Sequence, residues 1–221
     1  MDGNGRWAKK RGLPRKLGHR EGGKVFRKIV EACIDLDLQY VTFYALSTEN
    51  TSRPKEEVEA LVKLFDEYLD DIREMSDKNT RLRFIGGLEF FPKTTCKKMQ
   101  DAETATASNT GMTCCLALNY GGRSEIIRAV SQIISEHATG ISPTWELSEE
   151  NFANYLYTRG MPNVDLVIRT GGERRISNFL LWQAAYAEYY FTDVLWPDFG
   201  KENLATALGD YAERNRRFGG L

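Results

Sequence analysis

Two segments of the chain combine glycines and cations in a way that suits anion binding. The first opens the chain, where Asp2, Gly3 and Gly5 stand beside Arg6 and further cations continue to Arg20. Glycines let backbone N–H groups approach an anion closely, and arginine gives two parallel hydrogen bonds to its oxygens. We expect a phosphate or diphosphate site here, with Asp2 holding a hard divalent cation. A glycine turn beside a solvated basic face is the alternative, because the spacing matches neither G-x-G-x-x-G nor a Walker A loop.

The second segment runs from Arg169 to Asn178, directly after a predicted strand. It holds three arginines, a pair of glycines, and a serine and an asparagine that can cap a helix. In open parallel sheets, ligands collect beyond the carboxyl ends of the strands. The sequence therefore predicts a second anion site, which a single anionic substrate would not require. The alternative is a surface turn with ordinary salt bridges.

Two further positions have side chains that suit substrate or metal binding, and each also has a purely structural explanation. Residues 47–54 follow another predicted strand, and Asn50 and Arg53 can reach a substrate from there. Ser, Thr and Asn before a proline also cap helices, so capping is the alternative. Glu188 is an acid in an aromatic stretch, which fits either a metal ligand or a hydrogen-bonded interface acid.

Hydrolase and zinc chemistry are not indicated. The chain has no G-x-S-x-G elbow, and its four cysteines show no C-x-x-C spacing. Only two histidines are present to complete a mixed metal site. Cys114 and Cys115 stand in an apolar run and are expected to be buried small hydrophobes of a reducing compartment.

Composition fits one folded domain covering residues 1–221. Hydrophobic residues make up 42% of the chain and aromatic residues 11%, which is enough for a core. Lys and Arg total 30 against 31 Asp and Glu, so we exclude a disordered chain and a uniformly basic nucleic-acid coat. No apolar run is long enough to span a membrane, and the basic first residues include no signal-peptide core. A cytoplasmic location is expected.

Hydrophobic periodicity predicts alternating helices and strands. The first helix is expected to open near Gly22. Helices are predicted at about 24–36, 54–77, 93–107, 123–137, 148–158, 178–187 and 201–216, and strands at about 40–46, 82–85, 112–118 and 164–168. This alternation is typical of an α/β fold with a mostly parallel sheet covered by helices on both faces.

Several ordered motifs resemble the cis-prenyltransferases, with undecaprenyl diphosphate synthases the nearest group. The resemblance extends over essentially the whole chain. Its motifs are Met1 to Ala8, Gly18-His19, Ser47 to Asn50 with Arg53-Pro54, Asn119 to Arg123, Arg169 to Gln183, and Phe191 to Phe199.

The resemblance implies repeated cis condensation of isopentenyl diphosphate onto an allylic diphosphate, usually farnesyl diphosphate. The product would be a polyprenyl diphosphate such as undecaprenyl diphosphate, a carrier-lipid precursor for cell-wall glycans. By resemblance Asp2 and Glu188 bind Mg²⁺, and Asn50 lies near the reacting centre with Asp2. Isopentenyl diphosphate would bind Arg169, Arg175 and Ser177. The remaining substrate-binding residues would be Gly3, Asn4, Gly5, Arg6, Trp7, Arg15, His19, Ser47, Thr48, Glu49 and Arg53.

The resemblance also implies a hydrophobic tunnel for the growing lipid, lined by the helices at 24–36 and 54–72 and the strand at 40–46. A homodimer is implied, with residues 178–196 and the arginine-rich C-terminal tail as interface. Nucleic acid is not an expected partner, whereas peripheral contact with the inner face of the membrane is expected through the lipid product. A non-catalytic binding subunit of the same fold is the alternative function.

Three features depart from the family pattern. Thr51 stands where members usually have an aromatic residue, and Arg174 stands where some have histidine. The family also has a short apolar strand before the motif that begins at Met1. We therefore expect that strand to be missing before Met1, with exposed strand edges as the consequence.

Overall fold

The computed structural model describes residues 1–52, 55–73, 78–139 and 147–214. Within these residues the strands form a three-stranded sheet of order β1-β3-β2 and a two-stranded sheet of β4 and β5, and every pairing is parallel. The strands are β1 (Tyr40–Tyr44), β2 (Arg81–Ile85), β3 (Thr113–Ala117), β4 (Leu166–Arg169) and β5 (Glu188–Phe191). The parallel α/β class predicted from the alternation is confirmed.

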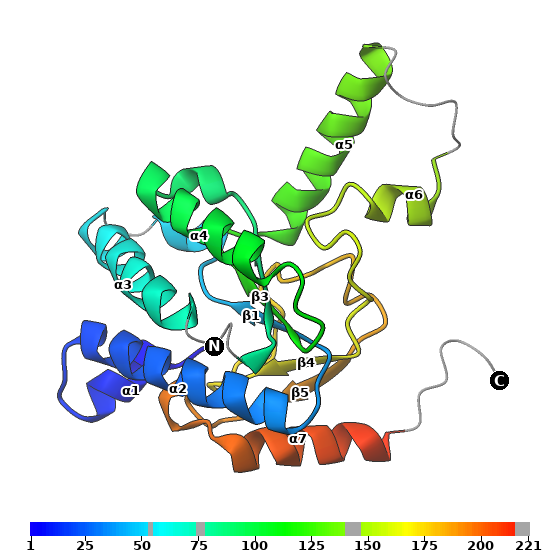
Figure 1. Cartoon of the computed structure of the whole chain (residues 1–221). Helices are drawn as coiled ribbons and strands as arrows, with labels where there is room; N and C mark the ends of the chain where they lie inside the picture. The colour runs from blue at the N-terminus through cyan, green and yellow to red at the C-terminus, as the bar shows by residue number, and fades with distance from the viewer. Residues whose placement is uncertain (53–54, 74–77, 140–146, 215–221) are drawn as a thin grey trace.

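Helices connect and cover the strands (Figure 1). They are α1 (Asn4–Lys10), α2 (Arg15–Asp35), α3 (Lys55–Arg73), α4 (Lys93–Thr106), α5 (Gly122–Ala138), α6 (Glu149–Ala153) and α7 (Lys201–Glu213), with 3-10 turns η1 (Thr48–Ser52), η3 (Leu88–Phe90) and η4 (Trp196–Asp198). Helix α5 projects away from the rest of the domain in Figure 1.

The core lies on both faces of β3, all of whose residues are buried. Successive side chains of a strand point to opposite faces. Cys114 and Leu116 therefore join the core cluster beneath α2, α3 and α4, whereas Cys115 and Ala117 join a second cluster with Val167. Burial raises the pKa of the Cys115 thiol to about 12. The prediction that these cysteines are buried hydrophobes is confirmed.

Two predicted elements are wrong. Residues 178–187 form successive turns rather than a helix, because Ser177, Asn178 and Leu180 have positive φ values of 51°, 63° and 46°, which a right-handed helix excludes. The following stretch, left unassigned by the periodicity, is strand β5, which pairs with β4 in register from Leu166–Glu188 to Arg169–Phe191. The helix predicted at 148–158 is present only as the short α6.

The first helix also begins earlier than predicted. Helix α2 starts at Arg15 and not near Gly22, and α1 precedes it. The glycines of α2 are packing residues and not helix boundaries. A Cβ atom on Gly18 would lie 2.0 Å from the Asn4 carbonyl oxygen, and one on Gly22 would lie 2.2 Å from Asn4 Oδ1. Their missing side chains let α1 lie directly against α2.

Substitution of Gly18 by alanine is expected to destabilise the fold. The new methyl group meets backbone rather than a flexible side chain, so α1 has to move away, at a cost of about 1–3 kcal/mol. Gly209→Ala in α7 is the matched control, because no atom lies within 4 Å of its added Cβ. That control is expected to be neutral or to stabilise the helix by about 0.5–1 kcal/mol. Urea unfolding measures both, and equal stability of the two variants would contradict the close packing.

Candidate active site

The two cationic segments predicted from the sequence meet at one place. Arg169 Nη2 donates to Asp2 Oδ2 at 3.0 Å, and Arg6 Nη2 lies 3.4 Å from Asp2 Oδ1. The Asp2 backbone is also fixed, since its N–H donates to Thr170 Oγ1 and its carbonyl accepts from Thr170 Oγ1 and the Trp196 N–H, each at 2.9 Å. The first residues are therefore anchored at the carboxyl end of β4.

These contacts determine the charge of Asp2. Partial burial acts to raise the pKa of its carboxyl group, but the hydrogen bond from Arg169 and the charges of Arg6 and Arg169 outweigh it, so the pKa lies below its ordinary value. Asp2 is an anion at neutral pH. Its contribution to stability is present above the pKa of the unfolded chain and is lost as the pH falls through the lower folded value.

Arg169 organises the loop that follows β4. Its Nη1 donates to Ser177 Oγ at 2.8 Å and also to the Arg175 carbonyl oxygen, while the Arg175 guanidinium pairs with Glu173. One partly buried guanidinium therefore holds both Asp2 and the loop, and it leaves the Arg175 side chain largely exposed. The close approach of Arg6 to Gly171, which has φ of 87°, excludes a side chain at that position.

A cavity of about 1080 Å³ adjoins these residues. Its polar end lies beyond the carboxyl ends of β1 and β4, where ligands collect in parallel sheets. Many of the residues predicted as functional line it: Asp2, Gly3, Asn4, Gly5, Arg15, His19, Ser47, Asn50, Arg169, Arg175 and Ser177. Arg15 also pairs with Glu57 at 3.3 Å and lies against Gly5, whose Cβ would be 3.2 Å from Arg15 Nε. The structure thus gathers cations, a carboxylate and exposed backbone at one end of the cavity.

The rest of the cavity is largely apolar. Side chains from α2, β1 and α3 line it, as the sequence predicted for a tunnel, and they include Phe26, Ile29, Phe43, Leu61 and Phe65. The carboxyl end of α7 and the stretch before β4 also contribute. A ligand with an anionic head and a hydrocarbon tail matches this division between a polar end and an apolar interior.

Several predicted residues lie beside the cavity and not on its lining. Arg6 bridges Asp2 and Glu173, whereas Trp7 turns away, with its indole N–H donating to Asp198 at 2.7 Å. Thr48 and Glu49 belong to η1, where the Thr48 N–H bonds the Tyr120 carbonyl. Direct substrate contact by Trp7 is therefore not supported. Arg53 lies outside the described residues.

Glu188 is not brought together with Asp2. It begins β5 and pairs with Arg214 at 2.7 Å, whereas Asp2 lies at the opposite end of the sheet, beside Arg169. The three residue steps from Glu188 to Phe191, which pairs with Arg169, correspond to roughly 10 Å of strand. Within a single chain the predicted pair of metal ligands, Asp2 and Glu188, is thus not formed, because Glu188 is part of an ion pair at the amino end of its strand.

Asn178 is a residue whose importance the sequence reasoning missed. Its Nδ2 donates to Glu49 at 2.8 Å, its Oδ1 accepts from the Arg123 N–H at 2.9 Å, and its carbonyl accepts from the Gly122 N–H at 2.7 Å. It therefore joins the segments that follow β1, β3 and β4. The only available signal was an asparagine in a turn, since asparagine tolerates the left-handed conformation that it adopts here.

The buried carboxylate of Glu125 is a second feature that the sequence analysis missed. It is 1% exposed and accepts hydrogen bonds from the Tyr120 hydroxyl, the Tyr157 N–H and Gln183. These three donors compensate for burying the charge. The cluster fixes the start of α5 against the turns at 178–187 and so supports the loop that carries Ser177.

Comparison with known proteins identifies similar chains. A family model described as "Putative undecaprenyl diphosphate synthase" matches residues 1–219. The isoprenyl transferase of Clostridium perfringens is 49% identical over the whole of this chain and 88% of its own length. A Micrococcus luteus protein named ditrans,polycis-undecaprenyl-diphosphate synthase, (2E,6E)-farnesyl-diphosphate specific, is 48% identical over the whole chain and 89% of its own.

Solved structures agree with the sequence comparison. The lavandulyl diphosphate synthase of Lavandula x intermedia, in complex with dimethylallyl diphosphate, superposes with a TM-score of 0.95 at 35% identity, covering 99% of this chain and 95% of its own. A probable undecaprenyl diphosphate synthase from Campylobacter jejuni gives 0.79 at 35% identity, covering 90% and 92%. Separately, none of the described helices is long and apolar enough to cross a membrane.

Proposed function

The chain belongs to the undecaprenyl diphosphate synthase family of cis-prenyltransferases, and on that premise we propose that it condenses isopentenyl diphosphate repeatedly onto farnesyl diphosphate. The Micrococcus luteus relative is named as farnesyl-diphosphate specific, which supports this primer. The product would be a long polyprenyl diphosphate of the undecaprenyl type, a carrier-lipid precursor. The names of the relatives favour this catalytic role over a non-catalytic binding subunit.

One observation supports the proposal most strongly. The ion pair between Asp2 and Arg169 joins the two anion-binding segments at the polar end of a cavity whose interior is apolar. Condensation of two diphosphates needs two adjacent anion sites, and a growing hydrocarbon needs a dry space beside them. The cavity residues of the described chain provide both.

The two segments divide the substrates between them in this proposal. The backbone of Gly3 to Gly5, with Arg15 and His19, would bind the allylic diphosphate, while Arg169, Arg175 and Ser177 would bind isopentenyl diphosphate. Asn50 also lines the cavity, and its Oδ1 accepts a hydrogen bond from the Ser47 N–H at 3.4 Å. Arg6 would act through Asp2 and the Gly171 carbonyl, because it contacts them and does not line the cavity.

The first step requires stabilisation of negative charge more than proton transfer. The allylic C1–O bond breaks, and its electron pair leaves with the diphosphate. The double bond of isopentenyl diphosphate forms the new carbon–carbon bond to C1, and the proton lost from C2 passes to an oxygen of the released diphosphate. Arginines fixed in advance near the departing oxygens stabilise the developing charge. The apolar lining excludes water from the carbocation-like carbon.

Mg²⁺ is the metal that this site would take. Among the described residues no cluster of three acidic, cysteine or histidine side chains is present. Asp2 supplies a carboxylate from the cavity lining beside the proposed diphosphate site, and Mg²⁺ commonly binds through one or two carboxylates together with substrate phosphates and water. The donor set therefore fits, with Asp2 as the protein ligand. When bound, the metal would add positive charge next to the leaving diphosphate.

Incubation with farnesyl diphosphate, labelled isopentenyl diphosphate and Mg²⁺ tests the function. A ladder of products that ends at one length, with cis double bonds and loss of product under chelator, is the expected result. Absence of any lipid product from folded protein would overturn it and favour the non-catalytic alternative. Dimethylallyl diphosphate in place of farnesyl diphosphate distinguishes a short-chain synthase, because that enzyme would stop after one condensation.

Asn178→Gly tests whether this side chain positions the site. Glycine keeps the left-handed backbone but removes the contacts with Glu49 and Arg123, so we expect kcat/KM to fall roughly 10- to 100-fold while the fold is kept. Asn79→Gly is the matched control, since Asn79 has φ of 56° and bonds Thr110 far from the site. Equal activity of the two variants would show that Asn178 is not a positioning residue.

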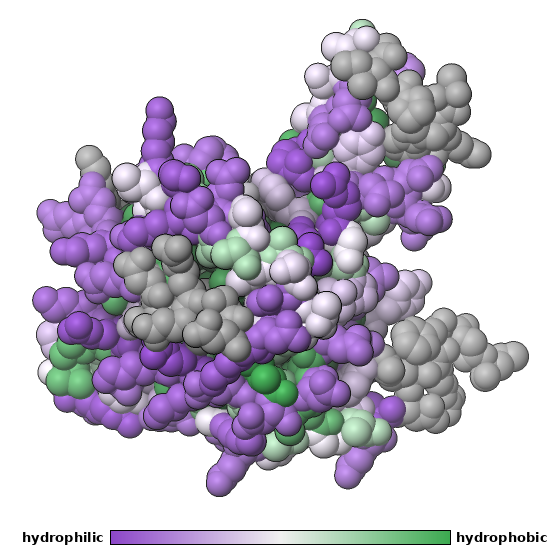
Figure 2. All heavy atoms as spheres, in the orientation of Figure 1, coloured by the Kyte–Doolittle hydropathy of each residue, from purple (hydrophilic) through white to green (hydrophobic). Residues whose placement is uncertain are grey.

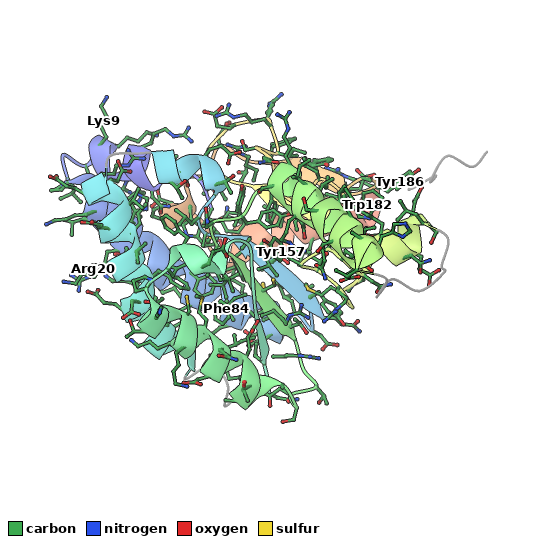
Figure 3. All side chains as sticks on the ribbon, turned by 90° about the horizontal axis from the view of Figure 1, so that it is seen from above. Lys9, Arg20, Phe84, Tyr157, Trp182 and Tyr186 are labelled. Carbon is green, nitrogen blue, oxygen red and sulfur yellow. The ribbon has the colours of Figure 1, made fainter. Side chains whose placement is uncertain are left out.

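The proposal also includes a homodimer that works in the cytoplasm against the inner face of the membrane. On the projecting helix α5, Ile127 and Ile134 are 66% and 63% exposed one above the other, which gives an apolar face for a second copy. Tyr186, 76% exposed and labelled near α5 in Figure 3, lies in the predicted interface segment. Light scattering of Ile134→Arg against the parent chain is expected to show the loss of a dimer.

A further inference from the structure

The turn that joins α1 to α2 carries a dense positive charge. From Asn4 to Arg20 the sequence contains no Asp or Glu. Residues 9–17, which we call the basic turn, are all exposed, and Figure 3 shows Lys9 pointing away from the body of the domain. The cations of the basic turn are Lys9, Lys10, Arg11, Arg15 and Lys16.

Only some of these cations have partners in the fold. Arg11 lies over the Trp7 ring, 4.1 Å from its centroid, and 3.3 Å from Asp198. Arg15 pairs with Glu57 at the polar end of the cavity. Lys9, Lys10 and Lys16 form no ion pair within the described residues. Three ammonium groups on one protruding turn therefore remain available to an external anion.

The basic turn also exposes two leucines between its cations. Leu13 and Leu17 are 38% and 37% exposed. Figure 2 shows a hydrophobic area over the turn between α1 and α2, at the left edge of the molecule, surrounded by hydrophilic surface. Leucines gain nothing from a purely ionic partner in water, whereas they gain free energy at the boundary between lipid headgroups and acyl chains.

We propose that the basic turn docks the enzyme on an anionic lipid surface, with the lysines at the phosphate headgroups and Leu13 and Leu17 inserted just below them. Long lysine side chains keep their charge at the headgroups while their stems lie along apolar surface. The leucines favour this partner over a soluble polyanion such as a nucleic acid. This inference assigns a docking surface to the membrane contact included in the proposed function, and its test is independent of the proposed reaction, because docking needs no turnover.

Vesicle sedimentation without substrate or metal tests the docking. The protein is expected to bind phosphatidylcholine vesicles that contain phosphatidylglycerol, and to bind pure phosphatidylcholine weakly. Replacing Lys9, Lys10 and Lys16 together by glutamine is expected to reduce partitioning roughly 100-fold, since each cation near an anionic leaflet contributes about fivefold. Leu13→Ser with Leu17→Ser is expected to reduce it roughly tenfold.

The control replaces Lys93, Lys97 and Lys201 by glutamine, which changes net charge equally on α4 and α7. It is expected to bind vesicles like the parent chain, and unfolding curves verify that each variant is folded. Three results would overturn the proposal: no binding of the parent chain to anionic vesicles, equal loss in the control, or an undiminished affinity in the leucine variant. The last result, with equal binding to a DNA duplex, would instead show a general polyanion surface.

Discussion

Asp2→Ala is expected to reduce turnover by a factor of at least about 10³ while the protein stays folded. The carboxylate is the one acidic group that the described chain places at the polar end of the cavity against Arg169. The fold is expected to survive because the anchoring bonds of residue 2, to Thr170 and Trp196, use its backbone and not its side chain. Single-turnover rates with saturating substrates measure the effect.

The Asp2→Asn variant keeps the shape of the side chain and removes its negative charge, so it tests the two contributions separately. The amide oxygen still accepts a hydrogen bond from Arg169, but it has no charge to offer Mg²⁺. We expect the asparagine variant to lose nearly as much activity as the alanine variant and to require more Mg²⁺ for half-maximal rate. Activity close to that of the parent chain in either variant would contradict the metal-binding role of Asp2.

Arg169→Ala is expected to raise the KM for isopentenyl diphosphate roughly 10- to 100-fold and to lower kcat as well. The substitution removes contacts to Asp2 and Ser177 at once and leaves Arg6 as the guanidinium paired with the Asp2 carboxylate. Arg169→Lys is expected to recover little, because one ammonium group cannot replace the two arms of the guanidinium. Steady-state kinetics with each substrate varied in turn make the measurement.

Arg214→Ala provides the matched control for Arg169. Arg214 also pairs with acids, Asp210 and Glu188, but at the other end of β5. We expect its loss to leave both KM values within a factor of about three. If the two arginine variants have the same kinetic effect, the assignment of the isopentenyl diphosphate site to Arg169 is wrong.

The elements predicted correctly are those whose signal is local. The apolar run before Ser47 and the apolar run at Cys114 and Cys115 specify strands whatever surrounds them, and β3 is buried throughout as predicted, whereas in β1 Phe43 alone is buried. The start of α2 was predicted incorrectly because its glycines were interpreted as a helix boundary. Gly18 and Gly22 instead lie inside the helix, where a side chain would clash with Asn4 of α1. That reason is visible only once the two helices are placed together.

The residues of the site also divide into those with a local sequence signal and those whose role depends on contacts between distant segments. Asp2 was predicted from its place in a glycine- and cation-rich segment and Arg169 from its position after a strand, while the role of Ser177 was implied by the family resemblance, and the three lie together. Asn178 was predicted only as a helix cap, since its bonding partners belong to two other segments of the chain. Helical spacing at 178–187 was misleading, because bonds from Gly122 and Arg123 hold Asn178 in a conformation that ends any helix.

The division of the strands into two sheets affects which parts of the molecule unfold locally. Among the described residues β1 and β4 belong to different sheets, and the polar contacts that join the two sheets include those of Asp2 and Asn178 at the active site and the buried Glu125 cluster. The sheet of β4 and β5 is then expected to exchange its amide hydrogens through a smaller opening than the fully buried β3. Diphosphates bound at the active site would join the two sheets and slow the amide exchange of β4 and β5. Substrate affinity and the cooperativity of unfolding would then depend on the same opening equilibrium.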